Sequence, residues 1–350
     1  MTQRIFDGHN DVLLRLWRRD RTGASFLSDG ADGHVDLGRA RRGGLVGGLF
    51  ATFVADTDRP QTAAREPNAD GRIDTPDIAA QQQERALKGT LGQLAVALRV
   101  ERKSEGAVKI CRSAAEIDET VAAGVFAMML HMEGAEAIGP GLDELEILHH
   151  IGLRSLGLVW SRPTIFGYGV PFRFPSTPDI GAGLTERGIA LVKACNRLGI
   201  MVDCSHLNEK GFWDVVRHST APIVATHSNA HVLCQVSRNL TDAQMDAIRD
   251  SEGVVGLNFA TFFLREDGRR TAATPLEVMT RHLDHMLNKL GPSGVALGSD
   301  FDGALVPTGI GDAAGLPNLV AAMRASGYSE DLIDGICYRN WLRVLSRTLG

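Results

Sequence analysis

The sequence has few of the features that mark secreted, membrane-bound or nucleic-acid-binding proteins. It contains 5 cysteines in 350 residues, and no two of them form a CxxC pair. A sparse, odd set of cysteines argues against a disulfide framework and indicates reduced thiols. No apolar run reaches the roughly 18 residues that a membrane span needs. Residues 1–11 leave no room for the apolar segment of a signal peptide. We therefore expect a cytoplasmic protein with no membrane partner.

An excess of basic residues is also missing. The formal net charge is -5 at pH 7, and the isoelectric point is about 6.1. This balance gives no sign of a nucleic-acid partner, and no glycine-rich phosphate loop follows a predicted strand. The hydrophobic fraction of 44% and the charged fraction of 23% are those of an ordinary globular protein. These absences leave a soluble enzyme or a small-molecule-binding protein as the classes to consider.

The sequence does contain eight apolar segments of strand length, separated by helical segments. The eight segments are residues 4–11, 43–54, 125–134, 153–160, 200–206, 222–229, 253–259 and 294–303. Most are apolar on both faces, which is typical of parallel strands covered by helices. The pattern predicts an α/β fold, a single (β/α)8 barrel domain over residues 1–350. An open, doubly wound sheet is the alternative.

Several local signals place helices and loops between these strands. We expect capping boxes at Thr241 and Thr274, a long helix over 77–103, and one C-terminal helix that begins after Ser329. Two long loops, 56–76 and 161–183, follow the second and fourth predicted strands. Both should lie at the mouth formed by the carboxyl ends of the strands, where barrel enzymes build their active sites.

Five of the eight predicted strands end in side chains that can bind metals. Because residues i and i+2 of a strand point to the same face, His9 and Asp11 should converge. The full set is His9 and Asp11, His131 and Glu133, His206, His227, and Asp300 and Asp302. One buried polar strand end is common, but five of this type would each need a buried partner. The pattern therefore predicts a metal site at the barrel mouth.

The number of these side chains exceeds what one tetrahedral zinc ion needs. The five candidate ligands are His9, Asp11, Glu133, His206 and His227. Two zinc ions, ~3.5–4 Å apart and bridged by a carboxylate, would accommodate them. Asp300 is then left over as a candidate acid or base, while Asp302 is expected to brace the turn after the last strand.

The motifs that carry these residues resemble those of a known family. The motifs of this chain, in order, are DGHND, HMEGAE, GLTERG, DCSH, ATHSNA, SRN and GSDFDG. These motifs and their spacing, including 21 residues from His206 to His227 and 11 from His227 to Arg238, resemble the membrane (renal) dipeptidase family of metallopeptidases, family M19. The resemblance covers nearly the whole chain.

The resemblance implies a binuclear zinc dipeptidase on a (β/α)8 barrel, usually a homodimer. By motif match, His9 and Asp11 would bind one zinc, His206 and His227 the other, and Glu133 would bridge them. Arg238 would hold the free carboxylate of a dipeptide substrate. Asp300 would serve as the catalytic acid and base while a metal-bridging hydroxide attacks the peptide carbonyl.

The chain departs from the family at one position that matters. Many members have a histidine at the end of the fourth strand that contacts the substrate carbonyl, and Trp160 stands there in this sequence. Its indole N–H could still donate to an oxyanion. Alternatively, Arg162 or Tyr168 from the next loop could replace the histidine, or Trp160 could pack the pocket wall.

Two other functions remain open from the sequence. The first is an amidohydrolase-type enzyme that acts on a non-peptide amide or a lactone, and the second is a catalytically silent metal-binding protein. Arg238 favours a substrate with a free carboxylate over the first alternative. Asp300 argues against the second, because a structural metal site needs no additional carboxylate.

Overall fold

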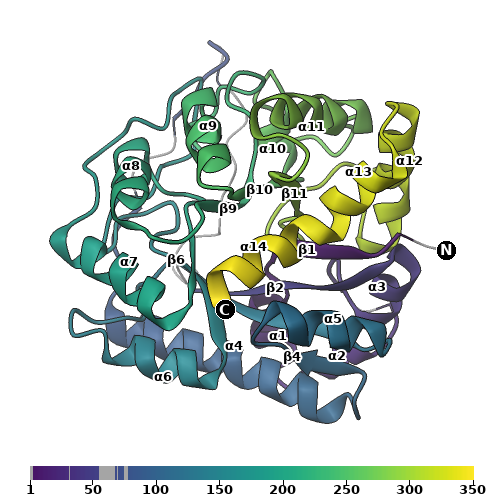
Figure 1. Cartoon of the computed structure of the whole chain (residues 1–350), viewed down its shortest axis with the longest axis horizontal. Helices are drawn as coiled ribbons and strands as arrows, with labels where there is room; N and C mark the ends of the chain where they lie inside the picture. Colours follow the sequence, from purple (N-terminus) through teal and green to yellow (C-terminus); the bar gives the residue numbers. More distant parts are fainter. Residues whose placement is uncertain (1–2, 31, 55–67, 69, 75–77) are drawn as a thin grey trace.

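Eight parallel strands form a nearly closed barrel in the computed structural model, which describes residues 3–30, 32–54, 68, 70–74 and 78–350. In sheet order they are β1 (Ile5–Asn10), β2 (Leu45–Phe53), β5 (Phe126–Glu133), β6 (Leu153–Gly157), β8 (Met201–Asp203), β9 (Val224–Ser228), β10 (Val254–Asn258) and β11 (Val295–Gly298). Each lies within one predicted segment. The (β/α)8 barrel is therefore confirmed, and the open-sheet alternative is wrong (Figure 1).

The barrel closes where its first and last strands meet. The backbone N–H of Asp300 donates to the carbonyl of His9 at 3.0 Å, and the N–H of Asp11 donates to the carbonyl of Phe301 at 2.8 Å. These bonds extend the contact between β1 and β11 past the ends of both strands. Closure thus occurs at the same residues that carry candidate metal ligands.

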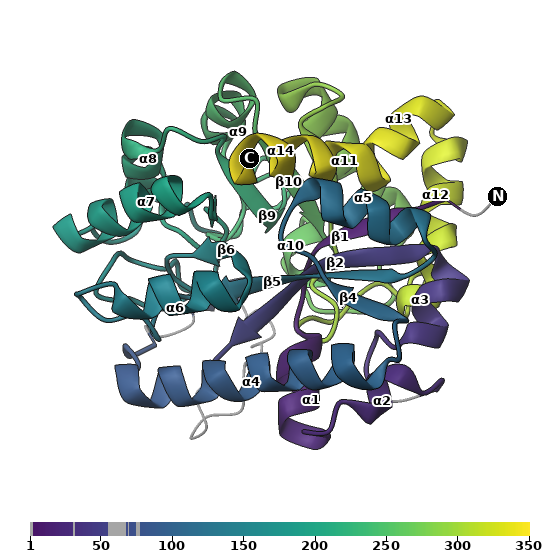
Figure 2. The same ribbon diagram turned by 60° about the horizontal axis from the view of Figure 1, so that its bottom comes forward.

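Helices cover the outside of the barrel, as Figures 1 and 2 show. They are α1 (Val12–Arg19), α2 (Ala24–Leu27), α3 (Leu37–Gly43), α4 (Gln83–Lys103), α5 (Ala114–Ala122), α6 (Asp143–Ile151), α7 (Glu186–Leu198), α8 (Glu209–His218), α9 (Asp242–Asp250), α10 (Thr261–Leu264), α11 (Leu276–Leu290), α12 (Leu316–Ala325), α13 (Glu330–Asp334) and α14 (Asn340–Leu349). Figure 2 shows α4 and α1, which contact each other, running beneath β2. The main apolar core lies between these helices and the strands.

The helix starts were predicted with mixed success. The capping box of Thr241 and Gln244 is present at α9. The one at Thr274 is wrong, because Pro275 occupies the cap position of α11 and the Thr274 hydroxyl donates to the carbonyl of Thr271 instead. The long helix α4 begins at Gln83, six residues later than expected. Ser329 caps only the short α13, and a π-helical turn separates it from α14.

Three short strands were not predicted. β4 (Val108–Ile110) pairs in parallel with the first half of β5. β3 (Ile73–Asp74) and β7 (Arg173–Phe174) form a separate antiparallel pair. This pair joins the loops that follow β2 and β6, so the two predicted mouth loops are tied to each other. Most of the 56–76 loop lies outside the described residues.

The opposite end of the barrel is filled by the C-terminal helix, which crosses the middle of the molecule in Figure 1. Trp341 of α14 is fully buried, and its indole N–H donates to the carbonyl of Leu297 at 2.9 Å. Gly8 permits this approach, since a Cβ atom there would lie 2.2 Å from the Trp341 ring. Apolar side chains of several strands pack around the tryptophan and close this end.

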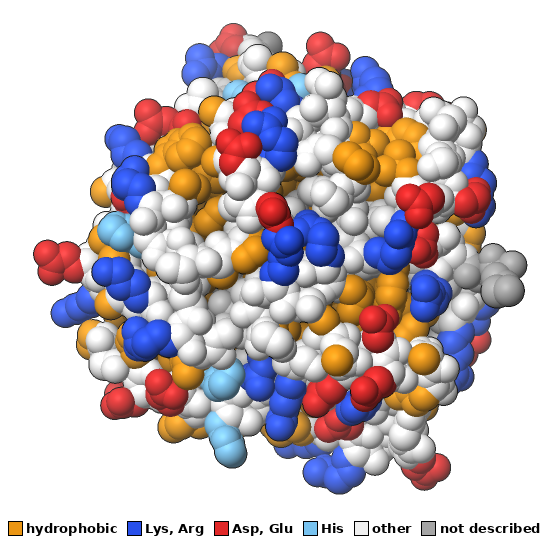
Figure 3. All heavy atoms as spheres, viewed as in Figure 1, with side chains coloured by type: hydrophobic (Ala, Val, Ile, Leu, Met, Phe, Trp, Pro, Cys, Tyr) orange, Lys and Arg blue, Asp and Glu red, His pale blue; other side chains and the backbone are white. Residues whose placement is uncertain are grey.

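The outer surface carries charges of both signs. On the face in Figure 3, the Lys and Arg side chains are interspersed with Asp and Glu side chains and form no continuous basic area. Within the described ranges, no helix combines the length and the apolar character that crossing a bilayer would require.

Candidate metal centre and active site

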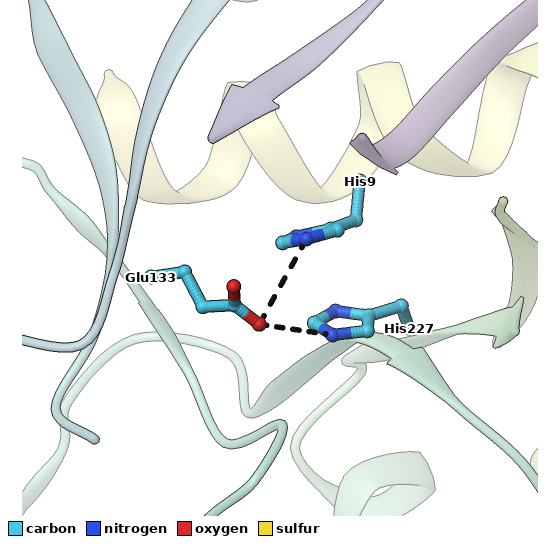
Figure 4. A group of neighbouring side chains, drawn as sticks. All are labelled: His9, Glu133 and His227. Carbon is cyan, nitrogen blue, oxygen red and sulfur yellow. Dashed lines mark ion pairs between the residues drawn. The ribbon is translucent and has the colours of Figure 1, made fainter. Parts of the chain in front are cut away.

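Three side chains from three strand ends converge on one point at the barrel mouth. His206 Nε2 lies 2.9 Å and His227 Nε2 lies 3.4 Å from the same carboxylate oxygen, Oε1 of Glu133. The two Nε2 atoms are 3.1 Å apart. Figure 4 shows His227 and His9 both directed toward the Glu133 carboxylate, and the ring of His9 stacks on that of His227 at 3.8 Å between centroids.

A second group shares His9 with the first. His9 Nε2 lies 3.8 Å from Glu133 Oε1 and 3.9 Å from Asp11 Oδ2. His9, Asp11 and Asp300 also offer ligand atoms that all lie within 4.8 Å of one another. The structure therefore brings together all five predicted ligands and places Asp300 beside them. Asp300 is within reach of a metal held by His9 and Asp11.

The electrostatics of this cluster are those of a site that holds positive charge. Burial raises the pKa of Glu133 well above its ordinary value and lowers the pKa values of His206 and His227 well below theirs. For His9, burial alone would lower the pKa, but the carboxylates of Glu133, Asp11 and Asp300 raise it to about 10. The three carboxylates thus stabilise a proton on His9, and they would stabilise a metal cation at the same place.

The donor atoms fit a metal ion by their chemistry. Both ring nitrogens of His9 and Oδ1 of Asp11 are buried without a hydrogen-bond partner among the described residues. Buried polar atoms of this kind are rare unless a ligand or ion pairs with them. Three imidazoles and two carboxylates are also the donors that zinc and similar ions prefer. The residues present therefore fit the two-metal centre expected from the sequence.

The backbone at the mouth adopts conformations that side chains rarely take. His206 has φ of 65° and Asp300 has φ of 59°, both in the left-handed region. Such strained positions concentrate at functional sites. Gly303 is needed beside them, because a Cβ atom there would lie 2.0 Å from Oδ2 of Asp11 and 2.6 Å from Oδ1 of Asp300.

Arg238 lies on the same mouth and is almost fully buried, with 3% of its surface exposed. Its guanidinium donates to Ser228 Oγ at 2.7 Å and to the carbonyl of His227 at 2.9 Å. Its Nε has no hydrogen-bond partner, and the described residues offer it no carboxylate in ion-pair contact. Burial lowers its pKa to about 10. A buried cation without an ion pair is costly, so an anionic ligand would be bound favourably here.

Asn258, at the end of β10, was missed by the sequence analysis. Its side-chain amide donates to Oδ2 of Asp300 at 3.0 Å and to the carbonyl of His227 at 3.3 Å. It therefore fixes the orientation of the Asp300 carboxylate. Burial also raises the pKa of Asp300, against the opposing charge of His9. The position of Asn258 at the carboxyl end of a barrel strand was the signal available in the sequence.

The three candidates for the family's missing histidine lie in different surroundings. Trp160 packs in the site wall, with its ring centroid 4.9 Å from Phe53 and 5.9 Å from His206. Arg162 is fully buried, where it pairs with Glu136 at 2.6 Å and donates to the carbonyl of Val54. These contacts argue against Arg162 as the replacement. The ring of Tyr168 lies against Gly181, and its part in substrate binding stays a prediction.

Two further polar side chains near the mouth have supporting positions. His131 forms a hydrogen bond with Ser155 Oγ at 2.8 Å, and its ring meets the ring of His9 edge-on at 5.4 Å. Asp302 pairs with Arg15 at 2.7 Å and accepts the backbone N–H of His34. Asp302 thus braces the turn after β11, as the sequence analysis expected.

A parallel barrel with buried histidines and carboxylates at its carboxyl end defines a metal-dependent hydrolase of the barrel type. The family model for membrane dipeptidases, peptidase family M19, matches residues 1–349, so the chain belongs to that family. The resemblance inferred from the motifs is therefore confirmed.

Related proteins agree with this assignment. A solved structure of a metallopeptidase from Rhodobacter sphaeroides, bound to a phosphinate mimic of the dipeptide L-Ala-D-Ala, has a TM-score of 0.96 and 51% identity, covering 99% of this chain and 100% of that chain. The solved structure of dipeptidase AC, a family M19 metallopeptidase, has a TM-score of 0.94 and 50% identity, with 100% of both chains covered. An uncharacterised protein from the pqqA 5′ region of Klebsiella pneumoniae is 50% identical over 254 residues, 72% of this chain and 93% of the relative.

Proposed function

We propose that this protein is a zinc-dependent dipeptidase that hydrolyses dipeptides with a free C-terminal carboxylate. The observation that carries the proposal is Arg238, a buried arginine with no carboxylate partner among the described residues, beside the convergent cluster of Glu133, His206 and His227. Such an arginine can bind a substrate carboxylate with two parallel hydrogen bonds. The dipeptide mimic bound to the Rhodobacter sphaeroides relative is of the same substrate class.

Each residue of the site has a defined task in this proposal. His9 and Asp11 would hold one zinc ion, His206 and His227 a second, and Glu133 would contact both. When bound, the two ions would supply a nucleophilic water and polarise the scissile carbonyl. Asp300 accepts a proton from the attacking water and transfers it to the leaving amine. Asn258 keeps the Asp300 carboxylate oriented for this transfer.

The side-chain preference of the enzyme would be set by an aromatic wall. Trp160 and Phe172 pack against each other and both flank the ring of His206. Phe172 also contacts Phe263, over which the guanidinium of Arg238 lies at 5.8 Å. These rings connect the metal centre to the carboxylate clamp. We propose that Trp160 contributes to this wall rather than to oxyanion binding.

The experiment that tests the function compares matched substrates. Free dipeptides should be cleaved, while the same dipeptides with a C-terminal amide, and longer peptides, should be poor substrates. Efficient cleavage of lactones or N-acyl compounds, with no preference for a free carboxylate, would favour the amidohydrolase alternative instead.

Metal content provides a second, independent test. Elemental analysis of protein purified without chelator should give two zinc-class ions per chain. Chelation should abolish hydrolysis and added Zn²⁺ should restore it. A ratio of one ion per chain that stays unchanged after zinc is added would contradict the binuclear centre. The homodimeric state and cytoplasmic location stay predictions, which light scattering and cell fractionation can test.

A further inference from the structure

On the side of His227 that faces away from the metal centre, hydrogen bonds link His227, Thr226 and Asp203 in series. Nδ1 of His227 lies 2.8 Å from the hydroxyl oxygen of Thr226, and that hydroxyl lies 2.6 Å from Oδ2 of Asp203. All three residues are buried, with at most 1% of their surface exposed. Water therefore does not compete for these contacts, and each hydrogen in the chain must be donated by one of the three side chains.

The direction of the chain follows from Asp203. Its Oδ1 accepts the backbone N–H groups of Ser205 at 2.9 Å and Thr226 at 2.8 Å, so this oxygen carries no proton. Burial alone would raise the pKa of Asp203, but the neighbouring His131 and the hydrogen bonds from Thr226 and Ser205 lower it. The ionised carboxylate accepts hydrogen bonds only. The single hydroxyl hydrogen of Thr226 is therefore donated to Asp203.

The hydrogen on His227 is then fixed as well. Because the Thr226 hydroxyl has donated its only hydrogen, it can only accept from Nδ1 of His227. Neutral imidazole carries one N–H, so the hydrogen resides on Nδ1 and Nε2 presents a lone pair. That Nε2 is the atom directed at Glu133 and His206. Another hydroxyl, Ser205 Oγ, is 3.5 Å from Thr226 Oγ1, too far to replace Asp203.

We infer that Asp203 and Thr226 are positioning residues that hold His227 in the tautomer able to bind metal through Nε2. The inference rests on the proposed metal centre and adds two residues to it that touch neither metal nor substrate. His206 differs, because its Nδ1 faces Ser161 Oγ at 2.8 Å and no acceptor for the Ser161 hydrogen occurs among the described contacts. The control of tautomer is thus specific to His227.

Asp203→Asn gives the sharpest prediction, because it reverses the direction of the hydrogen bonds between residues 203, 226 and 227. The two backbone N–H groups require the amide oxygen at the Oδ1 position, so the amide nitrogen must face Thr226. Thr226 then accepts from Asn and donates to Nδ1 of His227, which moves the imidazole hydrogen to Nε2 and weakens metal binding there. Thr226→Val removes the hydroxyl that links His227 to Asp203, and it favours neither tautomer of His227. The double variant should therefore bind metal more tightly than Asp203→Asn alone.

The test measures Zn²⁺ affinity of the metal-free protein by competition with a chromogenic chelator. Losses of supporting partners weaken metal binding by roughly 10–100-fold. We expect about 10-fold for Thr226→Val and about 100-fold for Asp203→Asn, with partial recovery in the double variant. Thr226→Ser should stay near wild type. Thr52→Val, which alters another buried threonine on a different strand, β2, is the matched control and should leave the affinity unchanged.

A second readout needs no metal. Nitrogen-15 NMR of the histidine-labelled, metal-free protein should show the hydrogen of His227 on Nδ1 in the wild type and on Nε2 in Asp203→Asn. An unchanged tautomer in that variant, or a double variant that binds no better than Asp203→Asn, would overturn the inference. Failure of the wild type to bind Zn²⁺ would instead overturn the proposed function, while the tautomer would still be decided by the NMR result.

Discussion

The two ends of the barrel are both buried but are built in opposite ways. The closed end is filled by Trp341, whose only polar atom is paired with a backbone carbonyl. The mouth contains His9 with no hydrogen-bond partner for either nitrogen among the described residues, and three non-glycine residues, His206, Asp300 and Asp302, in left-handed conformation. The buried polar atom of Trp341 is thus satisfied, whereas those of His9 are not. The difference indicates that the mouth is arranged for binding and chemistry, while the closed end maintains the fold.

The largest effect on catalysis at the mouth is expected from Asp300→Asn. Loss of an acid–base group should lower kcat by about 10²–10⁴-fold, while folding and both metal ions are retained. Steady-state kinetics and elemental analysis measure the two quantities separately. If metal is lost together with activity, Asp300 is a ligand of the ion held by His9 and Asp11, and its assigned role is wrong.

The matching change at the closed end is Trp341→Ala. Removing a fully buried tryptophan should lower the free energy of unfolding by about 3–5 kcal/mol, with kcat per folded molecule unchanged. Chemical denaturation followed by circular dichroism measures the stability. Trp213→Ala, on the half-buried face of α8, is the control and should cost less. A fall in kcat at full folding would show that the two ends are coupled.

A smaller effect is expected from Arg238→Ala, which removes the proposed clamp. The loss of charge-assisted hydrogen bonds to a carboxylate should reduce kcat/KM for dipeptides by roughly 10²-fold. Arg238→Lys should recover part of it, since lysine keeps the charge and loses the paired geometry. Arg265→Ala, a partly exposed arginine paired with Asp267, serves as the control. Equal losses on free and amidated dipeptides would argue against carboxylate binding.

The smallest effect should follow Trp160→His, which restores the family's residue in the wall. Because Trp160 packs on Phe53 and Phe172, the change should shift relative kcat/KM values among dipeptides by several-fold and leave metal binding intact. A panel of dipeptides with small and aromatic side chains would measure it. Identical preferences for both proteins would show that the wall does not select substrates.

The eight strands and the five convergent ligands could be predicted because both follow from short-range rules. Parallel strands show as apolar runs, and parallel strand ends necessarily meet at one mouth. The positions of His9, Glu133 and His227 thus required no knowledge of tertiary contacts. The resemblance of the motifs and their spacing to those of the family then implied the roles of the remaining residues.

The roles of other residues in the site depend on contacts between distant segments, and a position at a strand end was the only local signal for them. Asn258, Asp203 and Thr226 read as ordinary polar residues at strand ends, and only the folded chain shows what they orient. The burial of Arg162 and its pairing with Glu136 likewise required the tertiary structure. Thr274 failed as a cap because Pro275, with no N–H and extended ψ of 149°, is itself the cap position.

The closure of the barrel at β1 and β11 has a consequence for how the protein is made. His9 lies on the first strand of the barrel and Asp300 follows its last strand, yet the two are joined by a backbone hydrogen bond. The hydrolytic centre cannot assemble on a nascent chain until the final strand has emerged and docked. A chain that ends before Asp300 would therefore lack both this closure and the Asp300 carboxylate beside His9 and Asp11.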